Sequence, residues 1–172
     1  MICPSCGHDN LEGMDRCENC LAPFRDLDVP RSDTAAGLAR SVMQDDLRQL
    51  HQEETLFVTP TTPAMEVVRQ MKAAQTGCAL VLDTKDNQLK GIFTEHDVLT
   101  KMTTGAEPAD QVEVKDLMSP NPETLRETDS VAAALNKMSL GRFRHIPVVK
   151  NDGGYSVVSI KSVLQYIARE DW

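Results

Sequence analysis

The sequence is short of cationic residues, aromatic residues and long apolar runs. Its 172 residues include 18 lysines and arginines against 26 aspartates and glutamates, a net charge of −8, and only 4% are aromatic. Because neutralised phosphates supply most of the affinity for nucleic acids and anionic membranes, this balance argues against both as partners. The longest uncharged apolar run, residues 78–82, is far shorter than the roughly 20 residues that span a bilayer, so no transmembrane helix is expected.

The N-terminus also lacks the basic segment and apolar core of a secretory signal. With 41% hydrophobic and 26% charged residues, the composition is that of a globular protein. The length suits one ordinary domain, or one domain with a small appendage. These features predict a soluble, cytoplasmic protein.

Four of the five cysteines form two Cys-x-x-Cys pairs separated by ten residues: Cys3, Cys6, Cys17 and Cys20. This spacing lets a tight turn direct two thiolates at one ion, and four thiolates form the tetrahedral ligand set of structural zinc. Two disulfides or a redox pair are the competing interpretations, but the sequence shows neither a secretory signal nor a βαβ pattern around the pairs. Residues 1–24 are therefore predicted to fold around Zn²⁺, and they resemble a short zinc ribbon.

Residues 25–52 are predicted to be a proline-containing linker followed by a helix over 38–50, and the remainder of the chain repeats itself. Residues 64–71 carry apolar side chains at the spacing of one helix face, and the same pattern recurs 67 positions later. The apolar runs 78–82 and 145–149, which suit buried strands, follow at the same displacement.

Each copy then continues with a turn and a segment, 91–102 or 156–167, that indicates a strand ending in a capping Thr or Ser. A helix should follow, with its Val-Leu pair on the inner face. Each copy is thus predicted to run strand, helix, strand, strand, helix in an α+β fold. Duplication at this length implies two similar units, 53–104 and 112–172, that bury a shared face.

Three segments, GIFTEHDVL, VKDLMSPNPETL and RHIPVV, resemble a tandem pair of CBS domains, a Bateman module, and the resemblance covers about residues 40–170. It implies a non-catalytic regulatory module that binds AMP, ADP, ATP or S-adenosylmethionine in the cleft between the repeats. The family also implies a homodimer and an associated protein that responds to the ligand.

The motif Thr94-x-x-Asp97 has two interpretations. It is the pattern of a helix capping box, in which the hydroxyl and the carboxylate satisfy the free backbone amides. It also places a carboxylate at a helix N-terminus, where one carboxylate can accept hydrogen bonds from both hydroxyls of a ribose. Within a duplicated unit we favour the ribose role, and Thr94 can serve both.

The second copy has Ser159 and Ser162 at the corresponding positions, and a serine cannot clamp a diol as a carboxylate does. By the family resemblance, the first repeat's motif meets phosphate contacts from the second repeat. One competent site would then combine Thr94 and Asp97 with Arg144, His145 and Lys161. The other, weak or empty, would combine the two serines with Gly77, Cys78 and His96.

The same resemblance assigns the walls of the adenine site to Ile92, Ile146, Pro147 and the backbone near Glu123 and Thr124. Without the repeat, Arg144 and Lys161 would be read as ordinary surface charges. Two other functions stay open. One is a zinc-ribbon adaptor for nucleic acid or transcription machinery, which the acidic composition does not favour. The other is a constitutive dimer scaffold with a vestigial cleft. No catalytic triad, P-loop or open metal site indicates an enzyme.

Overall fold

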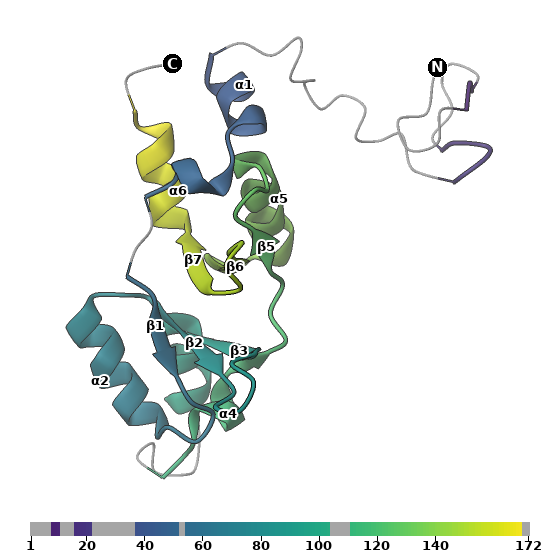
Figure 1. Cartoon of the computed structure of the whole chain (residues 1–172). Helices are drawn as coiled ribbons and strands as arrows, with labels where there is room; N and C mark the ends of the chain where they lie inside the picture. Colours follow the sequence, from purple (N-terminus) through teal and green to yellow (C-terminus); the bar gives the residue numbers. More distant parts are fainter. Residues whose placement is uncertain (1–7, 11–15, 22–36, 52–53, 104–110, 170–172) are drawn as a thin grey trace. The chain divides into compact units, whose positions relative to one another are not determined.

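A computed structural model describes residues 8–10, 16–21, 37–51, 54–103 and 111–169. The chain divides into two compact units, Met1–Ser41 and Val42–Trp172, and the second unit contains both sequence repeats (Figure 1). No helix among the described residues is long and apolar enough to cross a membrane.

The first repeat follows the predicted order of elements, and its β1 is parallel to β2 while β2 and β3 are antiparallel. A short strand from the connection to the second repeat, β4, extends the sheet, which therefore has the order β1-β2-β3-β4. The elements are β1 (Leu56–Val58), α2 (Ala64–Ala74), β2 (Cys78–Leu82), β3 (Leu89–Thr94), α3 (Glu95–Asp97), the π-helical turn η2 (Val98–Met102) and β4 (Ser119–Pro120).

The second repeat has the same order, in a sheet of order β5-β6-β7. Its register matches that of the first repeat, because Val58 pairs with Val81 and Leu125 pairs with Val148, each 67 positions further along. The predicted duplication and strand order are confirmed. The elements are β5 (Leu125–Arg126), α5 (Val131–Gly141), β6 (His145–Val149), β7 (Tyr155–Ser159) and α6 (Ile160–Ile167).

The segment that precedes each repeat packs against the other repeat. An isolated bridge joins Asp46 to Ser130, at the start of α5, and an equivalent bridge joins Glu113 to Pro63, at the start of α2. The two bridges are again 67 positions apart. The segments contain the 3-10 turn η1 (Leu47–Gln49) and the short helix α4 (Val114–Leu117). The repeats are therefore interleaved.

The predicted helix over 38–50 is interrupted in the structure. It consists of α1 (Gly37–Gln44) and η1, with Asp45 and Asp46 between them. The Asp46 carboxylate accepts a hydrogen bond from the backbone N–H of Arg48 at 3.0 Å, which caps η1. The backbone carbonyl of Asp45 accepts from the Val131 N–H, so the exchange between repeats ends the helix.

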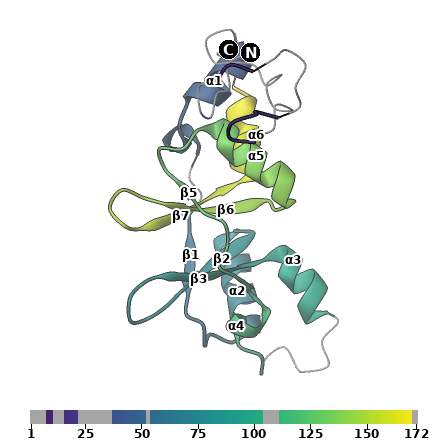
Figure 2. The same ribbon diagram turned by 90° about the vertical axis from the view of Figure 1, so that its right-hand side faces the viewer.

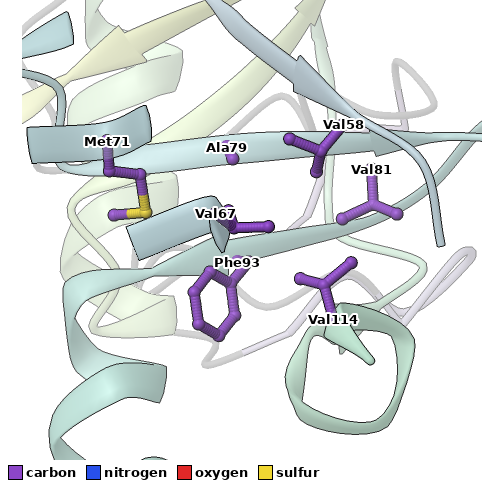
Figure 3. Close-up of a cluster of buried hydrophobic side chains, with 7 residues drawn as sticks. All are labelled: Val58, Val67, Met71, Ala79, Val81, Phe93 and Val114. Carbon is purple, nitrogen blue, oxygen red and sulfur yellow. The ribbon is translucent and has the colours of Figure 1, made fainter. Parts of the chain in front are cut away.

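The first repeat's hydrophobic core lies between its sheet and helices α2 and α4. Figure 3 shows its buried side chains: Val58, Val67, Met71, Ala79, Val81, Phe93 and Val114. A second cluster on the opposite face of the same sheet contains Cys78, Leu80 and Ile92 together with Val157 of β7. Because side chains alternate along a strand, β2 contributes to both clusters, which explains why its sequence is apolar throughout.

The shared cluster places the two sheets face to face within residues 42–172. Helices α5 and α6 lie on the outer side of one sheet, and α2 and α4 lie on the outer side of the other (Figures 1 and 2). The first-repeat Leu89 N–H also donates to the Tyr155 hydroxyl across the contact, at 3.4 Å. The predicted shared face is this sheet-to-sheet contact.

The Val-Leu pair of each last helix is only half buried, which corrects the prediction that both side chains face inward. Val163 is fully buried and Val98 partly so, but Leu99 is 66% and Leu164 57% exposed. Consecutive side chains on a helix point about 100° apart, so a single narrow inner face cannot take both.

Candidate functional site

Six of the ten predicted nucleotide-site residues line one pocket of about 700 Å³ where the repeats meet. They come from β3 and its capping corner, from the segment after β4, and from the start of β6: Ile92, Thr94, Asp97, Glu123, Arg144 and His145. The structure therefore brings the first repeat's carboxylate and the second repeat's cations to the same cavity.

Four predicted residues lie elsewhere. Lys161 lines an adjacent pocket of about 760 Å³, which also includes Arg144 and His145. Thr124 is exposed and lines neither pocket. Ile146 and Pro147 are fully buried, because β6 is the middle strand of its sheet, and they too line neither pocket.

The corner between β3 and α3 is a capping box. The Thr94 backbone N–H and hydroxyl both donate to Asp97 Oδ2, at 2.9 and 2.8 Å, and the Asp97 N–H donates to Thr94 Oγ1 at 3.4 Å. The capping interpretation of the motif is thus present in the structure, and the box fixes the carboxylate beside the pocket.

The other oxygen of Asp97 also has two partners. Lys101 Nζ lies 2.7 Å from Oδ1, and the Ser119 hydroxyl donates to Oδ1 at 3.3 Å. A carboxylate has about four acceptor positions, and here four donors fill them. The Asp97 side chain is accordingly only 4% exposed. A ligand hydroxyl can reach this carboxylate only by replacing one of these donors.

The corresponding corner of the second repeat is a capping box made of two serines. The Ser159 N–H donates to Ser162 Oγ at 3.1 Å, and the Ser162 N–H donates to Ser159 Oγ at 3.2 Å. The Ser162 hydroxyl donates its proton to the Ser159 carbonyl at 2.8 Å. Both serines are buried, so this corner presents no charged acceptor to a ligand.

The charges around the 700 Å³ pocket leave its arginines available for an anion. Two of its carboxylates are paired with lysines that do not line it, Asp97 with Lys101 and Glu123 with Lys137. In the described part of the chain, neither Arg142 nor Arg144 forms an ion pair. Both residues line the pocket, where a guanidinium group would attract a phosphate.

His145 contacts the first repeat across the pocket. A Cβ atom placed on Gly77 would lie 2.8 Å from His145 Nε2 and 3.3 Å from the Glu95 carboxyl carbon. The imidazole therefore rests on the glycine backbone at the start of β2, and a larger residue at position 77 would displace it. Gly77 was predicted for the second site; it lines the adjacent 760 Å³ pocket together with Ser159, and it also lies against the His145 ring.

Among the residues around the pocket that sequence reasoning missed are Lys101, Ser119, Arg142 and Phe143. Lys101 follows Asp97 by four positions, the spacing of a helical ion pair, which was a usable signal. Arg142 and Phe143 adjoin Arg144 in the sequence. Ser119 had no local signal, because it reaches Asp97 only through the pairing of β4 with β3.

Comparison with known proteins defines the family. Residues 39–103 and 114–169 match the CBS domain, so the chain belongs to the CBS domain family, and it carries two copies. It is 31% identical over 159 residues to the CBS domain-containing protein CBSCBSPB5 of Arabidopsis thaliana, covering 92% of this chain and 29% of the relative. The chain spans 20–29% of the length of four such Arabidopsis relatives.

Solved CBS structures share the fold. The structure titled CBSX2 in complex with AMP aligns with a TM-score of 0.56 at 21% identity, covering 70% of this chain and 93% of that one. The CBS domain pair of protein MJ0100, in complex with 5-methylthioadenosine and S-adenosyl-L-methionine, aligns with a TM-score of 0.63 at 16% identity, covering 72% and 100%. Proteins of this family are generally regulatory rather than catalytic.

The predicted metal ligands are only partly within the described residues, because Cys3 and Cys6 lie outside them. Cys17 is buried and Cys20 exposed, and neither forms a disulfide in the described part of the chain. They flank a turn closed by a hydrogen bond from the Leu21 N–H to the Cys17 carbonyl at 2.9 Å. No group of three or more candidate ligands occurs among the described residues.

Proposed function

We propose that the CBS pair is a regulatory sensor of adenosine nucleotides. The observation that carries the proposal is the single pocket that combines Thr94 and Asp97 of the first repeat with Arg144 and His145 of the second. Two structures of the same fold bind adenosine compounds, AMP in one case and S-adenosylmethionine with methylthioadenosine in the other.

In this proposal the ligand lies across the two repeats. Asp97 accepts from the ribose, Arg144 and His145 contact the phosphate, and Lys161 in the adjoining pocket contacts a longer phosphate chain. Ile92 and the segment at Glu123 and Thr124 contact the adenine. The ligand stabilises one arrangement of the repeats, and an associated protein responds to that change in population.

Calorimetric titration with AMP, ADP, ATP and S-adenosylmethionine tests the proposal. The Asp97→Ala variant should weaken each ligand by about tenfold or more, because a charge-assisted hydrogen bond is lost. Arg144→Ala should weaken AMP by a similar factor and leave adenosine nearly unchanged. Matched controls are Asp116→Ala and Arg126→Ala, which remove the same charges from positions that line neither pocket. Absence of binding by the unaltered protein would reject the sensor function.

A constitutive scaffold with a vestigial cleft is the second candidate. It is favoured by the four donors that occupy Asp97 and by the internally bonded serines of the other corner. The same titration separates the two functions, because a vestigial cleft binds none of the four compounds. An adaptor that contacts nucleic acid is not favoured at a net charge of −8.

We propose that the pairs Cys3–Cys6 and Cys17–Cys20 hold one structural Zn²⁺. The turn at Cys17–Cys20, closed by the hydrogen bond from the Leu21 N–H to the Cys17 carbonyl, supports the proposal. Zinc analysis of the purified protein should give one ion per chain, and Cys17→Ser should lose it. Cys78→Ala is the matched control, because Cys78 lies in the CBS core, and this variant should keep its zinc. Full zinc occupancy in Cys17→Ser would contradict a four-thiolate site.

We further propose that the protein forms a homodimer through its CBS repeats and acts on a protein partner in the cytoplasm. The exposed side chains of Leu99, Leu140 and Leu164 offer apolar surface for such contacts. Sedimentation equilibrium should give twice the chain mass of 19.0 kDa. A monomer at micromolar concentration would contradict the dimer and leave the nucleotide proposal untouched.

A further inference from the structure

The donors around Asp97 differ in how readily a ligand can replace them. The two donors to Oδ2 are the backbone N–H and the hydroxyl of Thr94, which the capping box holds in place. Lys101 Nζ bonds Oδ1 at 2.7 Å and also donates to the Leu117 carbonyl at 2.6 Å. The Ser119 hydroxyl, at 3.3 Å from Oδ1, is the longest of the contacts to the carboxylate.

Only one of the two donors to Oδ1 faces the cavity. Ser119 lines the 700 Å³ pocket together with Thr94 and Asp97, whereas Lys101 does not line it. A ligand that enters the pocket therefore meets the Ser119 hydroxyl before it meets the Lys101 ammonium. The exchangeable acceptor position of Asp97 is the one that Ser119 fills.

This arrangement limits how many sugar hydroxyls Asp97 can hold. Oδ2 is saturated by Thr94, and Lys101 keeps one of the two acceptor positions of Oδ1. One position remains when Ser119 withdraws, so the carboxylate can accept from one hydroxyl and not from two. The second hydroxyl of a ribose needs another acceptor within reach.

We propose that Ser119 is that acceptor and that it determines selectivity for a vicinal diol. In the ligand-free protein its hydroxyl occupies the place of a sugar hydroxyl on Asp97. When a nucleoside binds, one sugar hydroxyl donates to Asp97 Oδ1 and the other donates to Ser119 Oγ. Lys101 is a positioning residue that holds the carboxylate and restricts it to one hydroxyl. The inference rests on the proposed nucleotide site.

The backbone fixes Ser119 in this place. Strand β4 pairs with β3, with Ser119 opposite Ile92 and Pro120 opposite Gly91. The Met118 side chain packs on Gly91, where an added Cβ would lie 2.3 Å from the sulfur. The Asn121 N–H donates to the Lys90 carbonyl at 3.0 Å. The hydroxyl is therefore presented by a paired segment and not by a free loop.

The second repeat lacks this arrangement of a carboxylate shared by a lysine and a serine. Tyr166 is the residue four positions after Ser162, as Lys101 is after Asp97. Its hydroxyl donates to Asp45 Oδ2 at 2.7 Å. Ser162 has no carboxylate to share, and its proton is donated to the Ser159 carbonyl. Selectivity for a diol should accordingly come from the first corner only.

The test compares adenosine with 2′-deoxyadenosine and 3′-deoxyadenosine, because these uncharged probes remove any general effect of charge. Calorimetry is done on the full chain as wild type, Ser119→Ala, Ser119→Thr and the double variant Ser119→Ala/Lys101→Met. Ser139→Ala and Lys115→Met are matched controls, since both are exposed and line neither pocket. Circular dichroism checks that each variant is folded.

Ser119→Ala should bind adenosine about fivefold more weakly, the value of one neutral hydrogen bond, and should lose the preference over one of the two deoxy analogues. Ser119→Thr, which keeps the hydroxyl, should behave as wild type. The double variant should regain the preference, because removal of the ammonium frees a second acceptor position on Asp97. A merely structural role for Ser119 predicts no such recovery.

Two results overturn the inference and differ in what else they affect. If wild type binds adenosine and Ser119→Ala discriminates the analogues equally well, Ser119 does not contact the sugar, and the nucleotide site stands. If neither wild type nor any variant binds the three nucleosides, both the inference and the proposed function are rejected. Failure of the double variant to regain the preference would reject the role given to Lys101.

Discussion

The two strand-to-helix corners of the CBS pair share a backbone and differ in chemistry. Each is a capping box in which a hydroxyl accepts from the third helical amide. In the first repeat, the partner is a carboxylate with four donors around it. In the second repeat, it is a serine whose proton is donated to the local backbone. Duplication has thus kept the cap while only one copy retains a charged acceptor beside the pocket.

The residues four positions after Asp97 and Ser162 show the same difference between the repeats. Lys101 and Tyr166 each join the last helical segment of a repeat to the segment exchanged from elsewhere in the chain, at Leu117 and Asp45 respectively. Lys101 also pairs with the Asp97 carboxylate. In the first repeat, the residue that contacts the exchanged segment is therefore also part of the candidate site. One architectural contact is thus kept by different side chains in the two repeats, while the chemistry of the site differs.

The largest expected effect comes from the cores of the two repeats. Phe93, fully buried on β3, corresponds in position to Val158, buried on β7. Phe93→Ala should lower the free energy of unfolding by about 3–5 kcal/mol, and Val158→Ala by about 2 kcal/mol for the two methyl groups removed. Urea denaturation measures both values. An equal or larger loss at Val158 would show that the second repeat, and not the first, dominates stability.

Loss of the first repeat's capping box should likewise lower the free energy of unfolding more than loss of the second repeat's. Asp97→Ala removes the partner of four donors and should cost about 2 kcal/mol of stability, whereas Ser162→Ala should cost about 1 kcal/mol, the usual value of a lost cap. Both follow from urea denaturation at pH 7. Similar losses at the two corners would mean that the Lys101 and Ser119 contacts contribute little beyond the capping box.

The stability that the second repeat gains from the hydrogen bond between Tyr166 and Asp45 should depend on pH. Burial, with the hydrogen bond to the Asp45 carboxylate, raises the pKa of Tyr166 above its ordinary value. A raised pKa stabilises the protonated native state below the ordinary tyrosine pKa of about 10, and this contribution is lost as the pH rises above that value. Tyr166→Phe should cost about 1.5 kcal/mol at pH 7, and the difference from wild type should shrink above about pH 10.

Denaturation of wild type and Tyr166→Phe at pH 7 and pH 10.5 gives this comparison. The control at pH 7 is Tyr155→Phe, which removes only the long contact to the Leu89 N–H and should cost less. If the difference in free energy of unfolding between wild type and Tyr166→Phe stays constant over this range, the pKa of Tyr166 is not raised in the native state.

The smallest expected effect is at Gly77. Gly77→Ala should shift the His145 ring, which ends a side chain and can move, so stability should change by less than about 1 kcal/mol. Affinity for AMP should fall severalfold by calorimetry while affinity for adenosine is kept, because only the phosphate contact is disturbed. Equal affinity for AMP in both proteins would remove His145 from the phosphate site.

The repeated pattern was sufficient to predict the order of elements, because the helical periodicity and the apolar runs of the strands recur at a displacement of 67 residues, which becomes 65 in the last segment of each copy. It could not predict that residues around Asp46 and Glu113 pack on the opposite repeats, since such pairing leaves no periodic signal. The family resemblance placed Ile146 and Pro147 beside the ligand, but the structure buries them, because β6 is a central strand.

The site was predicted best where its residues share a corner or a strand. Thr94 and Asp97 were found because a capping box has fixed spacing, and Arg144 and His145 because the repeats could be aligned. The saturation of Asp97 was not predictable, since Ser119 arrives from a strand pairing 22 residues away in sequence. Local spacing defines a cap, but it does not reveal which acceptor positions are already filled.

The exchange of short segments between the repeats has a consequence for cooperativity. The Leu47 N–H donates to the Asp129 carbonyl and the Val114 N–H donates to the Thr62 carbonyl. Unfolding of either repeat therefore removes backbone hydrogen-bond partners from the other. Residues 42–172 should consequently melt as one cooperative unit rather than in two steps. A gene truncated between the repeats would encode a single repeat. The surface of this repeat that normally contacts the other repeat could be covered only by a second chain.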